Sequence, residues 1–243
     1  MELQVIKTEL KEISALRILF LDERNFQFTY DKCHLYGWAD TYLFTLDGHK
    51  AGYGSVWGKN KREDRDSIFE FYVIEPYRKL TNAFFTEFHA VCGASFIECQ
   101  SNDPLLTSML YEHSESVSSE AILFEDHFLT DFVNPDVVFE KKVSEENISR
   151  DDRQYILRHH DEILASGGMM LNYNMPYADL YYEVSEAHRQ KGLGSFMVQE
   201  LKKEAYLMGR VPAARCNIKN KASKATLLKA GFRICGWRLS GKI

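Results

Sequence analysis

Apolar residues recur along the chain with two spacings: a strict alternation in short runs, which is typical of strands, and a helical spacing in longer runs. The clearest turn signal is Asp47-Gly48, which lies between two strand-like runs and readily adopts the positive φ angles of a tight hairpin. Glu75-Pro76 ends a further strand-like run, and Pro104 suits the first turn of a helix. We therefore expect strands at residues 41–46, 50–57, 67–74 and 95–100, helices at 81–91 and 104–113, and a strand followed by a loop within 121–133.

The second half contains elements of the same kinds. Asn134-Pro135 is a turn-forming pair, so we expect two domains, residues 1–135 and 136–243, that meet there. Gly167-Gly168 is expected to form a turn between residues 162–166 and 169–173. The other expected elements are strands at 137–143, 179–185, 213–218 and 232–239, a polar helix at 145–161, and helices at 192–208 and 221–230.

The two halves align as a diverged repeat. When one strand of each half is superposed in sequence, both are followed by a short loop with an arginine and then by an amphipathic helix. The aligned pairs are Val73 with Val184, Glu75 with Glu186, Arg78 with Arg189, and Ala83 with Gly194. A chance match over so short a span is the alternative.

Composition and charge exclude several classes of protein. The 243 residues are 45% apolar, which is enough for a substantial core, and the formal net charge is -5 with a pI near 5.9. No basic field is present to hold nucleic acid or an anionic membrane surface, so we expect neither partner. No apolar run approaches the ~18 residues of a membrane helix, and the N-terminal residues lack a signal pattern.

Five cysteines, an odd number without a CxxC pair, argue against a disulfide framework and a zinc site. A reducing, cytoplasmic location is therefore expected. His159-His160 is placed on the polar helix without an acidic or cysteine partner at ligand spacing, so we expect it to be solvated and expect no metal site.

The stretch from His188 to Phe196 combines two glycines with basic residues, directly after the apolar run at 180–184 and before a helix. A strand that feeds a glycine turn at a helix N-terminus gathers several backbone N–H groups at the positive end of the helix dipole, a geometry that binds phosphate. The dinucleotide pattern GxGxxG fails because Met197 stands where its third glycine belongs, and the GxxxxGK[ST] loop does not match either. A hairpin turn and a glycine linker are the simpler alternatives.

Arg189, Gly192 and Gly194 form an RxxGxG pattern, and residues 216–223 together with 229–232 form a second block. At this spacing the two blocks resemble the GNAT superfamily of N-acetyltransferases, over about residues 137–243. The resemblance implies an α/β (mixed α+β) fold of two tandem acyl-CoA N-acyltransferase-like domains, each a mixed, mostly antiparallel sheet flanked by helices. It also implies acetyl-CoA as co-substrate, with its pyrophosphate held by the glycine turn.

By this resemblance, the residues expected to contact the cofactor are Val184, Ser185, Arg189, Gln190, Lys191, Gly192, Leu193, Gly194, Ser195, Asn217, Asn220 and Ser223. In the first half only Arg78 and the order of elements survive, because Thr81 and Ala83 occupy the positions of the two glycines. A side chain at position 81 would crowd an anion. We therefore expect residues 1–135 to be a degenerate domain that has lost coenzyme binding.

The implied reaction transfers acetyl to a primary amine of a small molecule or peptide, by direct attack in a ternary complex. In this family the strand before the glycine turn splays from its neighbour, so Val184 N–H is the expected donor to the thioester oxygen. Glu183 is the candidate general base, since it lies in an apolar strand where burial makes a carboxylate a better proton acceptor. The alternative is a strand residue that faces solvent or a neighbouring arginine.

The family's usual tyrosine acid is replaced by Leu227. A non-catalytic acyl-CoA binding or sensing module is therefore the alternative function. A structural protein that has lost both sites is a third possibility, against which Arg189, Gly192 and Gly194 argue. The sequence leaves open the acceptor, the acyl-chain preference, the pathway and the oligomeric state.

Overall fold

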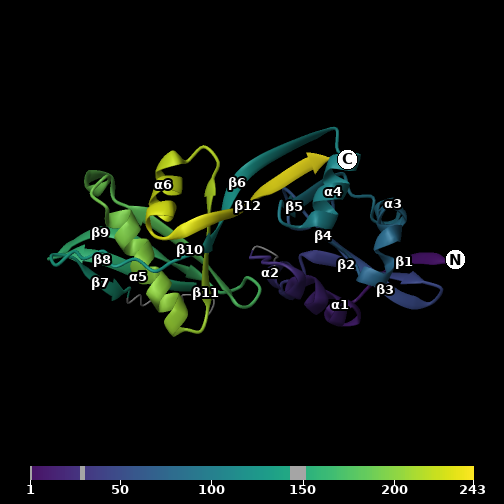
Figure 1. Cartoon of the computed structure of the whole chain (residues 1–243), viewed down its shortest axis with the longest axis horizontal. Coiled ribbons are helices and arrows are strands. Elements are labelled where there is room, and N and C mark those ends of the chain that lie inside the picture. The colour runs from purple at the N-terminus through teal and green to yellow at the C-terminus, as the bar shows by residue number, and fades with distance from the viewer. Residues whose placement is uncertain (1, 28–30, 143–151) are drawn as a thin grey trace. The chain divides into compact units, whose positions relative to one another are not determined.

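The computed structural model describes residues 2–27, 31–142 and 152–243. The chain divides into two compact units (Figure 1). The first comprises Met1–Glu120 together with Trp237–Ile243, and the second comprises Ala121–Gly236. None of the helices in the described residues is both long and apolar enough to cross a membrane.

This division does not coincide with the expected boundary at residue 135. It falls inside two strands, β6 (Ser116–Asp126) and β12 (Phe232–Lys242), each of which contributes to both units. The end of β12 pairs with β5 (Phe96–Gln100), from Arg238 opposite Gln100 to Lys242 opposite Phe96. The last residues of the chain therefore complete the sheet of the first unit, an arrangement that turn signals in the sequence do not reveal.

The first unit contains a sheet with the order β1-β2-β3-β4-β5, followed by the end of β12. Its strands pair antiparallel except for the parallel pair β4–β5. The expected hairpin is confirmed, because Leu46 pairs with His49 across Asp47 and Gly48, which both have positive φ. The elements of this unit are β1 (Leu3–Thr8), α1 (Leu10–Glu23), α2 (Asp31–Leu35), β2 (Ala39–Leu46), β3 (His49–Trp57), β4 (Ser67–Val73), the 3-10 helix η1 (Glu75–Leu80), α3 (Thr81–Cys92), β5 and α4 (Pro104–His113).

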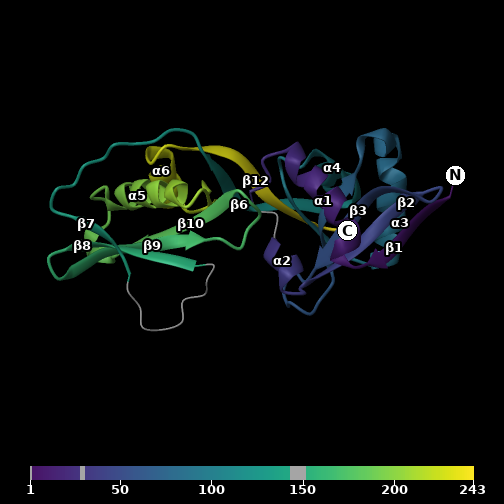
Figure 2. The same ribbon diagram turned by 90° about the horizontal axis from the view of Figure 1, so that it is seen from below.

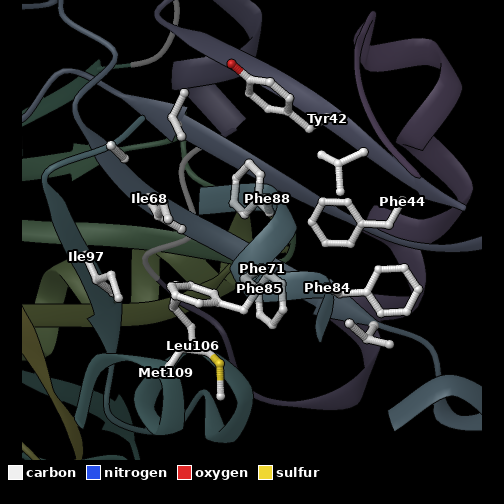
Figure 3. Packing of buried hydrophobic residues seen from close by; sticks show 14 of the residues in the cluster. Tyr42, Phe44, Ile68, Phe71, Phe84, Phe85, Phe88, Ile97, Leu106 and Met109 are labelled. Atoms are coloured by element: carbon white, nitrogen blue, oxygen red, sulfur yellow. The ribbon is translucent and has the colours of Figure 1, made fainter. Parts of the chain in front are cut away.

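Phenylalanines dominate the core on the side of this sheet that carries α3 and α4 (Figure 3). The rings of Phe44 and Phe84 stack with centroids 5.7 Å apart, and Phe71 meets Phe85 edge-on at 5.3 Å. Gly54 of β3 allows this packing, because a Cβ atom there would lie 2.4 Å from the ring of Phe88. Aromatic pairs of this geometry add stability beyond the area that they bury.

A buried ionic cluster lies beneath α1. The Glu70 side chain on β4 is 0% exposed, and its carboxylate accepts from Arg17 Nη2 and His34 Nε2, both at 3.0 Å. Arg17 Nη1 is also 2.6 Å from Asp31 Oδ1. Burial alone would raise the pKa of Glu70, but the charges of Arg17 and His34 lower it to about 2.

The second unit has the strand order β6-β11-β10-β9-β8-β7, and β10 and β11 are its parallel pair. Helices α5 and α6 cover one face of this sheet (Figure 2), and its main apolar core lies on that face. The elements of this unit are β7 (Val138–Lys141), β8 (Asp152–His159), β9 (Glu162–Met170), β10 (Tyr177–Val184), the 3-10 helix η2 (Glu186–His188), α5 (Leu193–Leu207), β11 (Val211–Asn217) and α6 (Lys221–Lys229), with the neighbouring parts of β6 and β12. The predicted fold class is confirmed, since each unit is a mixed, mostly antiparallel sheet flanked by helices.

The predicted helix at 145–161 is wrong where the structure describes it. Residues 152–159 form strand β8, residues 160–161 form its hairpin turn, and residues 145–151 lie outside the described residues. Tyr155, Ile156 and Leu157 are all buried, so this strand is covered on both faces and its short apolar run lacks the alternation of a half-exposed strand. His159 and His160 consequently lie at the strand end and in the turn rather than on a helix.

The predicted turn at Gly167-Gly168 is also wrong, because both residues lie within β9. A Cβ atom at Gly167 would lie 2.9 Å from Met197 Cε and 2.7 Å from Tyr181 O. This glycine therefore serves the close packing of α5 on the sheet, as Gly54 does for α3 in the first unit.

The two units repeat the same local arrangement. In each, a strand leads through a 3-10 helix into a long α-helix: β4, η1 and α3 in the first unit, and β10, η2 and α5 in the second. Arg78 Nε donates to Val73 O at 2.6 Å, and Arg189 Nε donates to Val184 O at 3.3 Å. The aligned arginines thus bind the last carbonyl of the preceding strand in both units, which supports the repeat.

Lys202 of α5 ties three elements of the second unit together. Its side chain is 1% exposed, and Nζ lies 2.5 Å from Asp126 Oδ1, 2.7 Å from Phe128 O and 2.9 Å from Ala230 O. These contacts join α5 to the end of β6 and to the end of α6. A buried charge held by one carboxylate and two carbonyls is costly to leave unpaired.

Replacing Lys202 by methionine should lower the free energy of unfolding of the second unit by about 3–5 kcal/mol, because the buried Asp126 carboxylate would lose its cation and keep only the Tyr206 hydroxyl. Urea denaturation measures this change. Lys203→Met is the matched control, since Lys203 is half exposed and pairs with Glu200 at the surface, where a pair contributes ~0–1 kcal/mol. Equal losses in both variants would contradict the structural role of Lys202.

The Glu70 cluster gives the first unit a pH-dependent stability. Because the pKa of Glu70 is depressed from its usual 4.5 to about 2, the ionised carboxylate contributes stability that is present above pH 4.5 and lost as the pH falls toward 2. Glu70→Gln should be less stable by about 3–5 kcal/mol at pH 7, with a difference from wild type that shrinks through this range.

Denaturation profiles between pH 7 and pH 3 test this expectation. Glu87→Gln, at an exposed position on α3, is the matched control and should leave the stability at pH 7 unchanged. A Glu70→Gln variant with wild-type stability at neutral pH would show that the buried cluster is energetically neutral.

Candidate functional site

A cavity of about 720 Å³ opens in the second unit at the N-terminus of α5, next to the end of β10 and the first turns of α6. Most of the residues singled out from the sequence line it: Glu183, Val184, Arg189, Gln190, Gly192, Leu193, Gly194, Ser195, Asn220 and Ser223. Segments far apart in the chain, which the resemblance had assigned to one cofactor site, are thus gathered around one space.

Three of the expected residues do not line this cavity. Ser185 Oγ donates to Leu164 O at 3.0 Å, and Asn217 Oδ1 accepts from the backbone N–H of Lys219 at 2.9 Å. Lys191 is exposed beside the cavity, with Nζ 3.4 Å from His188 Nδ1. The first two side chains are engaged with their own backbone surroundings, which a sequence pattern cannot distinguish from ligand contact.

The cavity also contains residues that the sequence analysis did not assign to the site: Tyr182, His188, Ala222 and Thr226. Tyr182 and Thr226 contact the turn through Gly194, since a Cβ atom there would lie 3.3 Å from Tyr182 Cε2 and 3.1 Å from Thr226 Cγ2. The available signal was the alternation of β10, which places Tyr182 and Val184 on the same face of the sheet.

The turn before α5 presents backbone donors to the cavity. Gly192 is the N-cap residue with φ of 81°, a conformation that favours glycine, and no side chain caps this helix end. The first intrahelical bond runs from Phe196 N to Gly192 O at 3.1 Å, so the N–H groups of residues 193–195 have no partner within the helix. An anion is the natural partner for such a group of donors.

Basic side chains surround this turn. Arg189 and Lys191 are exposed, and His188 Nε2 lies 2.7 Å from Glu162 Oε1 at the start of β9. The hydrogen bond from His188 lowers the pKa of Glu162. The mouth of the cavity therefore combines helix N–H groups with two exposed cationic side chains, a set of donors that suits a phosphate or pyrophosphate group.

The two central strands separate beside this turn. β10 and β11 pair from Tyr177–Val211 to Leu180–Ala214 and no further in the described residues. Beyond that point β10 stays paired with β9 as far as Val184, and β11 stays paired with β6 as far as Asn217. A gap therefore opens between two strands that are each held on their outer side.

Backbone donors of β10 face this gap. Ser185, the residue after Val184, donates its N–H to Leu164 O of β9 at 3.0 Å. Because the hydrogen-bonded and non-bonded pairs alternate along an antiparallel ladder, the N–H groups of Val184 and Tyr182 point away from β9 and toward the gap. The carbonyl oxygen of Val184 accepts from Arg189, as described above.

Glu183, the candidate base, and Leu227, which replaces the usual tyrosine acid, lie in different surroundings. Glu183 lines the cavity, but its side chain is exposed rather than buried, because it points to the sheet face opposite to Tyr182 and Val184. Leu227 is 1% exposed within the core beneath α6, so this position does not face the cavity. Burial raises the pKa of the nearby Cys216 thiol, which keeps it neutral and poorly nucleophilic.

The first unit satisfies the corresponding groups internally. Arg78 Nη2 lies 2.5 Å from Glu23 Oε1, and the Tyr72 hydroxyl donates to the same oxygen at 2.8 Å. Thr81, which stands where the first glycine of the turn would be, donates Oγ1–H to Arg78 O at 2.7 Å, and its backbone N–H bonds the same carbonyl. A carboxylate of the chain itself therefore engages the arginine that aligns with Arg189.

Within residues 2–27, 31–142 and 152–243, His, Cys, Asp and Glu side chains form no group of three or more arranged to hold a metal ion.

Comparisons with known proteins agree with this geometry. Residues 121–232 match the sequence model of the acetyltransferase (GNAT) family. No curated protein sequence matches the chain. Among solved structures, an acetyltransferase of the GNAT family from Colwellia psychrerythraea is 15% identical with a TM-score of 0.76, and the alignment covers 100% of both chains.

Two further structures resemble the whole chain. A tandem GNAT protein from the clavulanic acid biosynthesis pathway, solved without AcCoA, is 11% identical with a TM-score of 0.64, over 99% of this chain and 98% of that one. A GCN5-related N-acetyltransferase from Sphaerobacter thermophilus is 9% identical with a TM-score of 0.63, over 99% and 95%. At these identities the likeness establishes the fold.

The matched residues 121–232 lie in the second unit, which contains the glycine turn and the gap between β10 and β11. A GNAT domain implies an acyl-CoA as co-substrate and acyl transfer as its general chemistry. The chain therefore has the fold of tandem GNAT proteins, and its residues 121–232 match the model of the acetyltransferase (GNAT) family.

Proposed function

We propose that the chain is an N-acetyltransferase that transfers acetyl from acetyl-CoA to a primary amine by direct attack in a ternary complex. One observation carries this proposal: a cavity of about 720 Å³ joins an uncapped helix N-terminus to a gap between two strands. The first feature suits the pyrophosphate of coenzyme A, and the second suits its extended thioester arm.

The donor is bound by three sets of groups in this proposal. The N–H groups of residues 193–195 and the side chains of Arg189 and Lys191 hold the pyrophosphate. Ser195, Asn220 and Ser223 contribute polar side chains along the cavity between α5 and α6. The amide groups of the pantetheine arm pair with the backbone of β10 where β11 no longer does.

The same geometry supplies the chemistry. The N–H groups of Val184 and Tyr182 point into the gap, where they stabilise the negative charge that develops on the thioester oxygen as the amine attacks. The carbon–sulfur bond then breaks and the thiolate leaves. A thiol pKa near ~8.5 makes this group a tolerable leaving group without a dedicated acid, which accommodates Leu227.

Glu183 accepts the proton of the attacking amine, directly or through a water molecule. Its carboxylate lines the cavity and is exposed, so it reaches solvent and an incoming acceptor alike. The acceptor is a small molecule or a peptide that carries the amine. The exposed position of Glu183 supports a relay through water, because an exposed carboxylate passes its proton on readily.

The first unit has a supporting role in this proposal and binds no coenzyme. Glu23 engages Arg78, and Thr81 closes the end of α3, so the groups that hold an anion in the second unit are satisfied internally in the first. One acetyl-CoA should therefore bind per chain.

A non-catalytic acyl-CoA binding module is the second candidate. One observation favours it: Leu227 is buried in the core, and α6 contains no tyrosine that could protonate the leaving thiolate. Such a module would bind acetyl-CoA tightly and would not release coenzyme A with any amine.

Calorimetric titration should show one equivalent of acetyl-CoA bound at micromolar concentration, and Gly192→Val should weaken this binding at least about tenfold. The valine is strained at a φ of 81° and blocks the turn. Gly209→Val is the matched control, because Gly209 also has positive φ, with open space around it, at the other end of α5.

Both glycine variants should lose about 1–2 kcal/mol of stability from backbone strain. Equal affinities for acetyl-CoA in the two variants would remove the phosphate turn from the proposal. Two equivalents bound to the wild-type chain would show that the first unit retains a coenzyme site.

In the presence of a panel of primary amines, Glu183→Gln should lower kcat/KM by about 100-fold or more and leave the dissociation constant of acetyl-CoA unchanged. Glu186→Gln, in the exposed 3-10 helix η2, is the matched control and should retain activity. Release of coenzyme A, followed with and without amine, measures this. Tight binding by the wild-type chain with no turnover on any amine would favour the binding module instead.

A further inference from the structure

Side chains bridge the gap between β10 and β11. Tyr182 and Cys216 lie two residues beyond the last strand pair, Leu180–Ala214, on opposite sides of the opening. The Tyr182 hydroxyl donates to Ser223 Oγ at 3.1 Å, and Ser223 stands in the first turn of α6, the helix that follows β11. Ser223 therefore connects β10 to the helix that leads on from β11, at the point where the backbone hydrogen bonds between the two strands end.

The position of Ser223 is fixed independently of this bridge. Asn220 caps α6, and its Oδ1 accepts from Ser223 N at 3.0 Å. Tyr182 and Cys216 both belong to the sheet face that carries the main core of the second unit, where Cys216 is buried and Tyr182 is half-buried. The hydroxyl of Ser223 is thus held by the helix and presented to Tyr182, whose ring packs against the core.

The first unit contains half of this arrangement. β4 and β5 also separate after a short parallel ladder, which ends at Ile68–Ile97. Cys99 Sγ of β5 lies 3.6 Å from Thr107 Oγ1 of α4, so a hydroxyl of the helix that follows β5 also lies against this sheet. The residue that aligns with Tyr182 is Phe71, whose ring packs against Phe85 and has no hydroxyl. The complete bridge therefore occurs in the unit that carries the cavity.

A bridge of this kind has a mechanical consequence. Two strand ends whose facing backbone groups lack partners tend either to close on one another or to fray, because unpaired backbone groups are costly. A side-chain connection through a helix holds the two strand ends farther apart than neighbouring strands in a hydrogen-bonded sheet. It thereby keeps the N–H groups of Tyr182 and Val184 available to a ligand instead of to β11.

We propose that Ser223 is a positioning residue that, through its hydrogen bond with Tyr182 and its place in the first turn of α6, holds the gap at the width needed by the thioester arm of acyl-CoA. This inference rests on the proposed function for the identity of the ligand. It assigns Ser223 to the geometry of the strands, with its hydroxyl already engaged by the protein, rather than to recognition of the coenzyme's phosphates.

The bridge is tested first without ligand. Tyr182→Phe and Ser223→Ala should each lower the urea midpoint, and the double variant should unfold at the same midpoint as Ser223→Ala alone, because the tyrosine hydroxyl has lost its acceptor. Ser108→Ala, which removes a helical hydroxyl from α4 of the first unit, is the matched control and should add independently to Tyr182→Phe. Fully additive effects of Tyr182→Phe and Ser223→Ala would overturn the bridge.

The positioning role is then tested with two ligands. Acetyl-CoA has the thioester arm, whereas adenosine 3′,5′-bisphosphate has the nucleotide without it. Ser223→Ala should raise the dissociation constant of acetyl-CoA about tenfold and leave that of the bisphosphate unchanged, and Ser223→Thr should restore the affinity for acetyl-CoA. Gly192→Val, in contrast, should weaken acetyl-CoA binding through the turn itself.

The outcomes separate the two proposals. Equal loss of affinity for both ligands, or no loss for either, in Ser223→Ala would overturn the positioning role while the wild-type chain still binds acetyl-CoA. A wild-type chain that does not bind acetyl-CoA would overturn the proposed function and the positioning role with it. The urea midpoints of Tyr182→Phe, Ser223→Ala and the double variant would still decide whether the bridge exists.

Discussion

The separation of β10 from β11 is the constraint on which the second unit depends. Each strand keeps its outer partner, so the opening exposes one row of backbone groups on each side without unravelling the sheet. These groups require hydrogen-bond partners, and an apolar ligand cannot provide them. A ligand with amide groups along an extended arm and a reactive carbonyl at its end can, which is why the geometry favours an acyl-CoA over a compact apolar molecule.

The gap between the strands can persist only if the helices that cover the sheet are held in place. α5 must approach the sheet closely, and Gly167 permits this because a side chain there would meet Met197. Gly194 lets α5 lie close to Tyr182 of β10 and to Thr226 of α6. α5 must also stay fixed with respect to the end of β6, which the buried Lys202–Asp126 pair ensures. The shape of the cavity therefore depends in part on residues outside its lining, such as Gly167 and Lys202, and a change in either would alter the site through packing.

Local signals in the sequence were sufficient where one residue type determines the backbone. Asp47-Gly48 predicted its hairpin, and the glycine turn after Arg189 predicted where α5 begins, because positive φ angles and helix starts depend on few residues. The predictions from sequence were wrong where contacts between residues far apart in the chain determine the structure. Gly167 was predicted to lie in a turn, but it is a strand residue that leaves room for the side chain of Met197 on α5. The polar run before His160 was predicted to be a helix, but it forms a strand that is covered on both faces. The exposure of Glu183 likewise depends on which face of β10 the helices cover. The end of β12 belongs to the first unit because it pairs with β5, a long-range contact that no local pattern predicts.

The two units place aligned groups in different surroundings without a change of fold. In both, an arginine binds the last carbonyl of the strand and stands near the start of the long helix. In the second unit its remaining donors and the helix N–H groups face a cavity, whereas in the first unit Glu23 supplies a carboxylate to Arg78 and Thr81 closes the helix end. An internal carboxylate is present at all times and carries no translational cost of binding, so it outcompetes a free anion for the same donors. In the proposed function, the first unit thus gains stability from the groups with which the second unit binds coenzyme A.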